Sequence, residues 1–498
     1  MAGARQRFWG WTGGAMVALL ASQAMAEPWI EAGDARMRTD IELLAAYNII
    51  DGPTTMWPLP WAQVMRSIAE MPDRAFPPHV EAALARVRAG APSTKDYRSM
   101  GMEAHAGATS REKMVRGFDG GVRENAEAGV SAEKHWGASY AKLSVGWRDG
   151  QPGKDINFDN SYFAAALGNW VAYAGTVDQW WGGGWDSGMI LSNNARPYPK
   201  VGIQRLDPKP FETKWLSWLG NWNVNLTVGR LDGGETRTDI NHPVVAHIRV
   251  SLQPIDRLDI SFSRAIQTCG QGRSCGFSNW TDALIGLGDR DNTGTTDEPG
   301  NQIAGADIRY SGVIGSMTYG LYAETIAEDE NQPIVDKYSL SVGATLGGYW
   351  ESQQLQWRLR TEAADTKAGN IFGLGGDPLN NVTFSNFIFT DGFEFLDRTI
   401  GHTLSTDSTL ITLEATAIDR QSRNYWLRYR YAKVNRSDGP RNEVSSNREV
   451  VNLVEMGSQI PFDWGEGRVE VRLMDDRPNT PGRSPFDAQV EASLRWRF

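Results

Sequence analysis

The chain has 498 residues, 22% of them charged and 41% hydrophobic, and 60 acidic against 50 Lys and Arg side chains give a formal net charge of -10. This acidic balance argues against a nucleic-acid-binding protein, and a mean hydropathy of -0.43 is too polar for a bundle of membrane helices. Two cysteines exclude a disulfide-rich scaffold, whereas 20 Trp and 53 Gly in so polar a chain are typical of one membrane class, the outer-membrane barrel.

Residues 1–26 have the pattern of a secretory signal peptide. Arg5 and Arg7 supply the basic start, an apolar stretch covers residues 16–21, and Ala24-Met25-Ala26 forms a small-x-small cleavage site. The apolar stretch is too short to span a membrane as a helix. We therefore expect a mature protein that begins near Glu27 and works outside the cytoplasm.

Residues 27–96 are expected to form a small helical unit. Apolar residues recur at three- and four-residue steps within residues 37–47, 61–68 and 80–87. Pro60 and Pro77-Pro78 stand where the second and third helices should begin. The apolar stripes are narrow, so these helices must pack on another part of the chain. They are natural candidates for a periplasmic cap or plug.

Residues 97–498 alternate between apolar and polar side chains, which is the signal of β-strands. Residues 338–346, 355–361 and 490–498 show the alternation clearly. One face carries aliphatics with aromatics near the strand ends, and the other carries Arg, Glu, Ser, Gly and Asn. This pattern predicts an all-β transmembrane barrel of about 18 antiparallel strands. Long polar segments, expected as loops, occupy residues 149–161, 267–303, 327–337, 366–387, 434–448 and 475–486.

The two cysteines, Cys269 and Cys275, fall within one of these loop-like segments. Thiols oxidise outside the cytoplasm, and no further metal ligands are evident nearby. We expect a disulfide that closes a small loop.

Four sequence segments in register carry a resemblance to a known family. They are Arg38-Thr39-Asp40-Ile41 with the following Trp57-Pro58-Leu59-Pro60-Trp61, Asp178–Ser187 with Leu191–Pro197, Ser263–Gln267 with Gly270–Arg273, and Ile400-Gly401-His402. From about residue 34 to its C-terminus, the chain resembles the capsule assembly Wzi family of bacterial outer-membrane proteins. The resemblance implies an 18-stranded barrel with a periplasmic helical cap, acting as a surface lectin that attaches capsular polysaccharide to the cell. It identifies no binding residues.

A sugar-binding site must therefore be chosen from the chemistry of the side chains. Sugar rings stack their C–H faces on aromatic rings, and their hydroxyls bind amides, carboxylates and guanidiniums. One glycine-rich segment offers all of these groups. The candidate polysaccharide-binding residues are Trp180, Trp181, Trp185, Asp186, Asn193, Asn194 and Arg196. The structural alternative is that these tryptophans belong to an interfacial girdle or brace a loop in the lumen.

Two other motifs have weaker chemical readings. Asp289–Glu298 begins like a calcium loop, but Gly300 stands where the bidentate Glu should be, so we interpret it as a solvated loop. His402, Ser405 and Asp407 have the residue types of a hydrolase triad, yet side chains adjacent in one loop seldom adopt that geometry. We expect neither a metal, a cofactor nor an enzyme activity.

The sequence thus favours a monomeric outer-membrane lectin whose partners are lipid and capsular or extracellular polysaccharide. The alternative is an outer-membrane porin for small anionic or sugar solutes. Its anion-attracting path would be lined by strand arginines of the polar face. Those residues are Arg358, Arg360, Arg428, Arg430 and Arg495.

Overall fold

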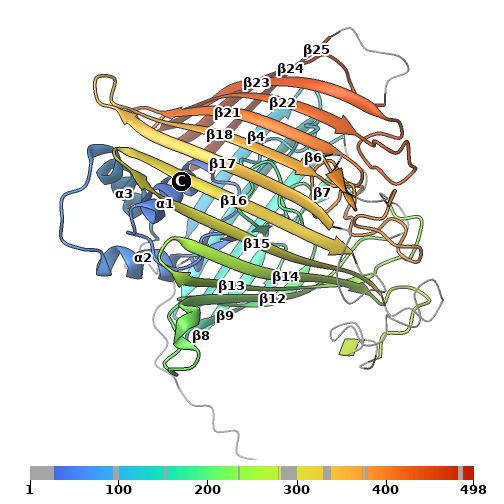
Figure 1. Ribbon diagram of the computed structural model, residues 1–498, viewed down its shortest axis with the longest axis horizontal. Coiled ribbons are helices and arrows are strands. Elements are labelled where there is room, and N and C mark those ends of the chain that lie inside the picture. The colour runs from blue at the N-terminus through green and yellow to red at the C-terminus, as the bar shows by residue number, and fades with distance from the viewer. Residues whose placement is uncertain are drawn as a thin grey trace, which may run out of the picture.

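The computed structural model describes residues 27–92, 100–150, 154–233, 236–276, 278, 280–281, 300–328, 338–372, 374–375, 379–479 and 486–498. The signal-like residues 1–26 and the calcium-like loop 289–298 lie outside these ranges. The described residues form a closed antiparallel barrel in which the last strand pairs with the first (Figure 1). The predicted barrel of about 18 strands is confirmed, because β7 and β8 share one position beside β6 and together count as one interrupted strand.

The barrel strands follow one another around the wall in chain order. They are β4 (Gly101–Thr109), β5 (Ala126–Trp136), β6 (Ser139–Asp149), β7 (Ile156–Asn157), β8 (Tyr162–Leu167), β9 (Trp170–Gly175), β11 (Lys200–Arg205), β12 (Asn221–Arg230), β13 (Val244–Ile255), β14 (Leu258–Thr268), β15 (Asn301–Ile314), β16 (Met317–Glu328), β17 (Tyr338–Trp350), β18 (Leu355–Asp365), β21 (Thr409–Ile418), β22 (Asn424–Val434), β23 (Glu449–Phe462), β24 (Gly465–Met474) and β25 (Asp487–Arg497). A short 3-10 helix, η1 (Ser217–Leu219), lies between β11 and β12.

Strand alternation sorts the side chains between lipid and lumen. On β22, Leu427 and Tyr429 point outward and are 53% and 40% exposed in the isolated chain, whereas Arg428 and Arg430 point into the lumen and are 7% and 2% exposed. A continuous belt of exposed apolar side chains needs an apolar environment, which lipid provides. The period-two pattern in the sequence therefore reflects the strands of the barrel wall, whose side chains face lipid and lumen in turn.

The two ends of the barrel differ. At the turn end, adjacent strands are joined by tight turns such as residues 256–257, 315–316 and 463–464. At the loop end, long connections cover residues 110–125, 176–199, the described parts of 366–408, and 435–448. In Figure 1 the helices gather at one end of the strands and these loops gather at the other. Asn48, which follows α1, binds Asp256 of a tight turn at 3.0 Å, so the helices lie at the turn end.

The helices described within residues 27–92 occupy the positions that the sequence predicts. They are α1 (Ala35–Ala46), α2 (Trp61–Glu70) and α3 (Pro78–Gly90). Asp34 caps α1 by accepting a hydrogen bond from the backbone N–H of Met37 at 2.9 Å, and Pro78 begins α3. Their shared core includes Ile41, Leu44, Val64, Val80 and Leu84, each at most 1% exposed. Among the described helices, none is long and apolar enough to cross a membrane.

Three short two-stranded sheets complete the structure. β1 (Trp29–Ile30) pairs with β3 (Leu59–Pro60), β2 (Met56–Trp57) pairs with β10 (Trp180–Trp181), and β19 (Asn370–Ile371) pairs with β20 (Leu374–Gly375). The second of these joins the helical unit to a loop that enters from the other end of the barrel.

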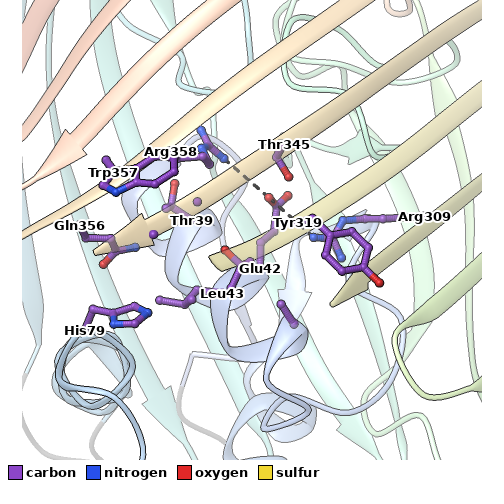
Figure 2. A pocket seen from close by; sticks show the side chains of 14 residues that line it. Thr39, Glu42, Leu43, His79, Arg309, Tyr319, Thr345, Gln356, Trp357 and Arg358 are labelled. Carbon is purple, nitrogen blue, oxygen red and sulfur yellow. Dashed lines mark ion pairs between the residues drawn. The ribbon is translucent and has the colours of Figure 1, made fainter. Parts of the chain in front are cut away.

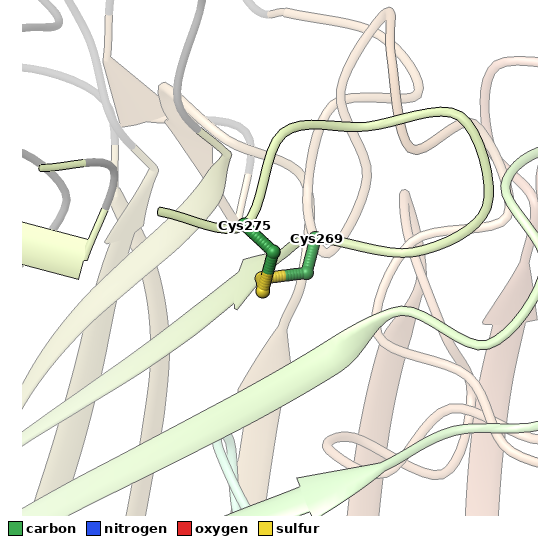
Figure 3. Close-up of a disulfide and its surroundings, with 2 residues drawn as sticks. All are labelled: Cys269 and Cys275. Carbon is green, nitrogen blue, oxygen red and sulfur yellow. A yellow bond between two sulfur atoms is a disulfide. The ribbon is translucent and has the colours of Figure 1, made fainter. Parts of the chain in front are cut away.

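The expected disulfide is present directly after β14. Cys269 and Cys275 are joined, with their Cα atoms 4.8 Å apart (Figure 3). Cys269 has φ of 61° and is buried. The bridge closes a small loop at the loop end of the barrel.

Candidate functional site

The segment between β9 and β11 contains all seven candidate sugar-binding residues, and it folds into the lumen. Its Trp180 and Trp181 form β10, opposite Trp57 and Met56 of the helical unit. The backbone N–H groups of Trp185 and Asp186 donate to the Glu362 carboxylate of β18 at 2.8 and 3.0 Å. The segment therefore binds both the helical unit and the far wall of the barrel.

The tryptophans of this segment are part of an interior aromatic cluster. Trp180 and Trp185 contact the Phe118 ring edge-on, with centroids 5.3 and 5.6 Å away. Two guanidiniums cover Trp185: Arg38 of α1 lies 4.3 Å from the ring centroid and Arg358 of β18 lies 3.8 Å away. Desolvated cation–π contacts of this kind stabilise a fold. These rings brace the lumen.

Asp186 is the centre of a buried ion-pair network. Its carboxylate accepts hydrogen bonds from both terminal nitrogens of Arg360 at 3.1 and 3.0 Å and from Arg430 at 2.8 Å. Burial opposes ionisation, but the Arg360 and Arg430 guanidiniums hold the pKa of Asp186 well below its usual range. Arg360 and Arg428 also contact Glu414, and Arg430 also contacts Glu455. The network runs along the lumen side of four neighbouring strands, β18, β21, β22 and β23.

This network changes the interpretation of the strand arginines. Arg358, Arg360, Arg428 and Arg430 were expected to line an anion path, but each is at least nine-tenths buried and paired with carboxylates. A guanidinium held by carboxylates on a filled side of the lumen has no free charge to offer a solute. The predicted anion path along these four residues is therefore wrong.

Asn193, Asn194 and Arg196 have structural partners too. The Asn194 side chain donates to the Thr399 carbonyl at 2.8 Å, and the Asn193 side chain donates to the Phe118 carbonyl at 3.3 Å. Arg196 forms ion pairs with Glu124 and Asp159. All three side chains bind loops of the chain itself.

The seven predicted sugar-binding side chains are between 0% and 7% exposed. The structure brings them together, but it offers none of their faces to a polymer outside the barrel. Their burial conflicts with the predicted sugar platform and agrees with the alternative, in which they brace a loop in the lumen. Composition alone could not separate the two, because both use Trp, Asn, Asp and Arg.

The triad candidate also has a structural role. His402 Nδ1 accepts from the backbone N–H of Leu404 at 3.3 Å, and Ser405 Oγ donates to Glu443 at 3.0 Å. Burial lowers the pKa of His402 to about 4, so the ring is neutral at neutral pH. Asp407 accepts from the backbone N–H of Asn381 at 3.0 Å. Within the described part of the chain, these three side chains hydrogen-bond to other groups and not to one another.

The helical unit is attached to the barrel wall by charge. Glu42 of α1 lies between Arg309 of β15 and Arg358 of β18, with nitrogen–oxygen distances of 3.8 and 3.6 Å (Figure 2). Arg38 Nε donates to the same carboxylate at 2.9 Å. Despite burial, Arg309, Arg38 and Arg358 together lower the pKa of Glu42. A cavity of only about 40 Å3 remains between α1, α3 and the strands. This close contact closes the turn end along β15–β18.

The sequence pattern did not identify the exposed polar groups at the loop end as a candidate site. We define the loop face as Lys367, Asn380, Ser437, Asp438, Ser446, Asn447, Arg448 and Asn479, all exposed or half-buried. They come from the segments 366–387, 434–448 and 475–486, which the sequence marks only as long and polar. Because several loops contribute, only the fold shows that they meet.

Hydrogen bonds between neighbouring loops hold the loop face in shape. Lys367 Nζ donates to Ser437 Oγ at 2.8 Å, and Ser437 Oγ donates to Asn380 Oδ1 at 3.0 Å. Asn479 Oδ1 accepts from the backbone N–H of Ser446 at 2.9 Å. Phe387, in the same connection as Asn380, is 45% exposed. The face thus presents amide and hydroxyl groups in fixed positions, and one of its connections also carries an exposed aromatic ring.

Comparisons with known proteins give a consistent result. The family model for capsule assembly protein Wzi matches residues 95–471. A 55.8 kDa protein from the cps region of Klebsiella pneumoniae is 25% identical over 456 residues, which are 89% of this chain and 84% of that protein. The structure of Wzi from Escherichia coli, an outer-membrane carbohydrate-binding β-barrel involved in group 1 capsule assembly, has a TM-score of 0.79 at 20% identity. It covers 94% of this chain and 99% of its own.

Proposed function

The chain belongs to the capsule assembly protein Wzi family, and from this premise we propose that it binds capsular or extracellular polysaccharide and holds it at the cell surface. The barrel places the protein in the outer membrane. Its structural relative from E. coli is a carbohydrate-binding barrel, which supports the same ligand class here. The role is attachment rather than catalysis, and the unit that acts is a lipid-embedded monomer.

We assign the loop end to the cell exterior and residues 27–96, with the tight turns, to the periplasm. In outer-membrane barrels the short turns face the periplasm and the longer loops face outward. The helical unit then caps the periplasmic mouth along β15–β18. The polysaccharide then contacts the long loops at the cell exterior.

The observation that carries the proposal is the loop face itself. Its amide and hydroxyl groups are already hydrogen-bonded in fixed positions, so they complement sugar hydroxyls without a large ordering cost. Such a surface binds each short stretch of glycan weakly. A long polymer contacts many barrels at once, so avidity retains it.

The test is binding of purified polymer to the full-length protein in detergent or nanodiscs. The triple variant Lys367→Ala, Asn380→Ala, Arg448→Ala should lose most polymer binding while remaining folded. The matched control carries Asn48→Ala and Arg74→Ala, polar residues at the turn end, and should bind as the wild type does. Equal binding by the loop-face variant would contradict the assignment.

A cellular experiment tests the function as a whole. Deletion of the protein should leave polymer synthesis intact but shift polymer from the cell surface to the medium. Loss of synthesis in the deletion strain would argue for a role upstream of attachment.

A further inference from the structure

The lumen is packed on one side and hollow on the other. Lumen-facing side chains of β12 and β13, such as Asn225, Arg249 and Ser251, are at most 1% exposed. Those on β25 become more exposed toward the turn end, from Glu491 at 0% to Arg495 at 48% and Arg497 at 63%. Solvent therefore enters the barrel beside β25.

The hollow side is one large cavity, which we call the vestibule. It has a volume of about 950 Å3 and lies between the N-terminal segment, α1, and the strands β4–β6, β24 and β25. Arg495, Arg497 and Phe498 line it near the turn end, whereas Asp159, Asn160 and Asp178 line it near the loop end. The vestibule thus runs along most of the wall.

A roof formed by three loops closes the vestibule at the loop end. The connections after β4, β7 and β9 contribute Arg123, Asp159 and Arg196 respectively. Arg196 pairs with Asp159 and with Glu124, and Arg123 pairs with Asp178 at 3.0 Å. The roof joins its loops mainly by ion pairs: the Asp159, Asp178 and Arg123 side chains are 21%, 12% and 14% exposed, whereas Arg196 and Glu124 are 7% and 1% exposed.

The roof differs in kind from the packing beside it. Trp180 and Trp181, in the same connection as Arg196, are 0% exposed and held by aromatic contacts. Arg123, Asp159, Asp178 and Arg196 line the vestibule, so water in it can hydrate these charges when their ion pairs part. Separating them therefore costs less than emptying a packed aromatic site, where nothing replaces the lost contacts. When the lumen opens, the roof should open before the packed half does.

We propose that the vestibule is the inner limb of a gated path for small hydrophilic solutes, with the roof as its gate. The path follows the strands that line the vestibule, β4–β6, β24 and β25, and it borders the paired arginines at Asp119, which lines the vestibule and pairs with Arg428. Among the described lining residues, eleven carboxylates face nine Lys or Arg side chains. With charges so nearly balanced, the path discriminates little between anions and cations.

This activity is separate from polysaccharide attachment, and ionic current tests it without any glycan. Full-length protein is reconstituted in planar bilayers in KCl. The wild type should remain closed, and Arg196→Ala and Arg123→Ala should each raise mean conductance at least tenfold, with similar K+ and Cl- permeability. Arg495→Ala, which removes an ion pair at the vestibule mouth but not in the roof, is the control and should remain closed.

A second variant distinguishes the vestibule from a leak through a damaged barrel. Ser131 of β5 lines the middle of the vestibule. Ser131→Trp added to Arg196→Ala should fill the path and return the conductance to the wild-type level. Heat-modifiable migration on gels confirms that each variant is a folded barrel. Folded Arg196→Ala protein without current, or current that persists with Ser131→Trp, would overturn the proposal.

Discussion

The buried carboxylate of Asp186 offers a sharp test of how the packed half of the lumen is held together. Asp186→Asn keeps the shape of the side chain but removes its charge from beside Arg360 and Arg430, which approach it to 3.0 and 2.8 Å. Breaking a buried ion pair by removing one partner costs about 3–5 kcal/mol. Both guanidiniums keep other carboxylate partners, Glu414 and Glu455, so we expect the lower end, about 3 kcal/mol.

The assay is urea unfolding of the refolded protein in detergent micelles, followed by tryptophan fluorescence. The control is Asp73→Asn, an exposed residue at the turn end, which should stay within about 0.5 kcal/mol of the wild type. If Asp186→Asn also unfolds within that margin, the ion-pair network does not stabilise the lumen and the reasoning fails.

The same group predicts a dependence on pH. The pKa of Asp186 is depressed in the folded protein, so its contribution is complete above the unfolded value of about 3.9 and is lost as pH falls toward the folded value. The difference between wild type and Asp186→Asn should therefore be constant from about pH 5 to pH 8. It should shrink below about pH 4. A difference that disappears between pH 6 and 8 would contradict the assigned pairing.

Three further changes have defined outcomes. Trp180→Ala should destabilise the barrel by about 3–5 kcal/mol in the same unfolding assay, because it empties a buried indole site, yet polymer binding per folded molecule should not change. Cys275→Ser should cost about 2 kcal/mol or less, the loop-closure estimate for so short a loop, and should speed protease cleavage after β14; unchanged cleavage would mean that the loop is held by other contacts. Glu42→Gln should loosen the helical unit and accelerate proteolysis within residues 35–90, with Glu81→Gln on the exposed face of α3 as the control.

Strand alternation, the helix periods and the disulfide were predictable because each depends on residues close in the chain. The period of two places Leu427 outside and Arg428 inside whatever the rest of the barrel does. The lumen could not be predicted in this way. Asp186 is separated from Arg360 by 174 residues and from Arg430 by 244, and no local pattern links them.

The fate of the Trp180–Arg196 segment shows a second limit. Its glycines, tryptophans and amides suit either an exposed sugar platform or an interior brace. The structure shows an interior brace, because the lumen-facing carboxylates of Glu362 and Glu324 accept hydrogen bonds from backbone N–H groups of this segment. The acceptors lie on β18 and β16, whose lumen-facing carboxylates have no distinguishing mark in the sequence.

The lumen segment between β9 and β11 also constrains the order of assembly. It is synthesised and exported well before β18 and β22, which carry its partners Glu362, Arg360 and Arg430. Until those strands are in place, its carboxylate and backbone groups have no interior partners and must remain hydrated. Closure of the barrel wall and loss of water from its interior must then occur together, late in folding. Folding should therefore be slow and strongly cooperative, as expected for contacts between residues so far apart in the sequence. A chain truncated before β22 should bury neither its tryptophans nor its charges.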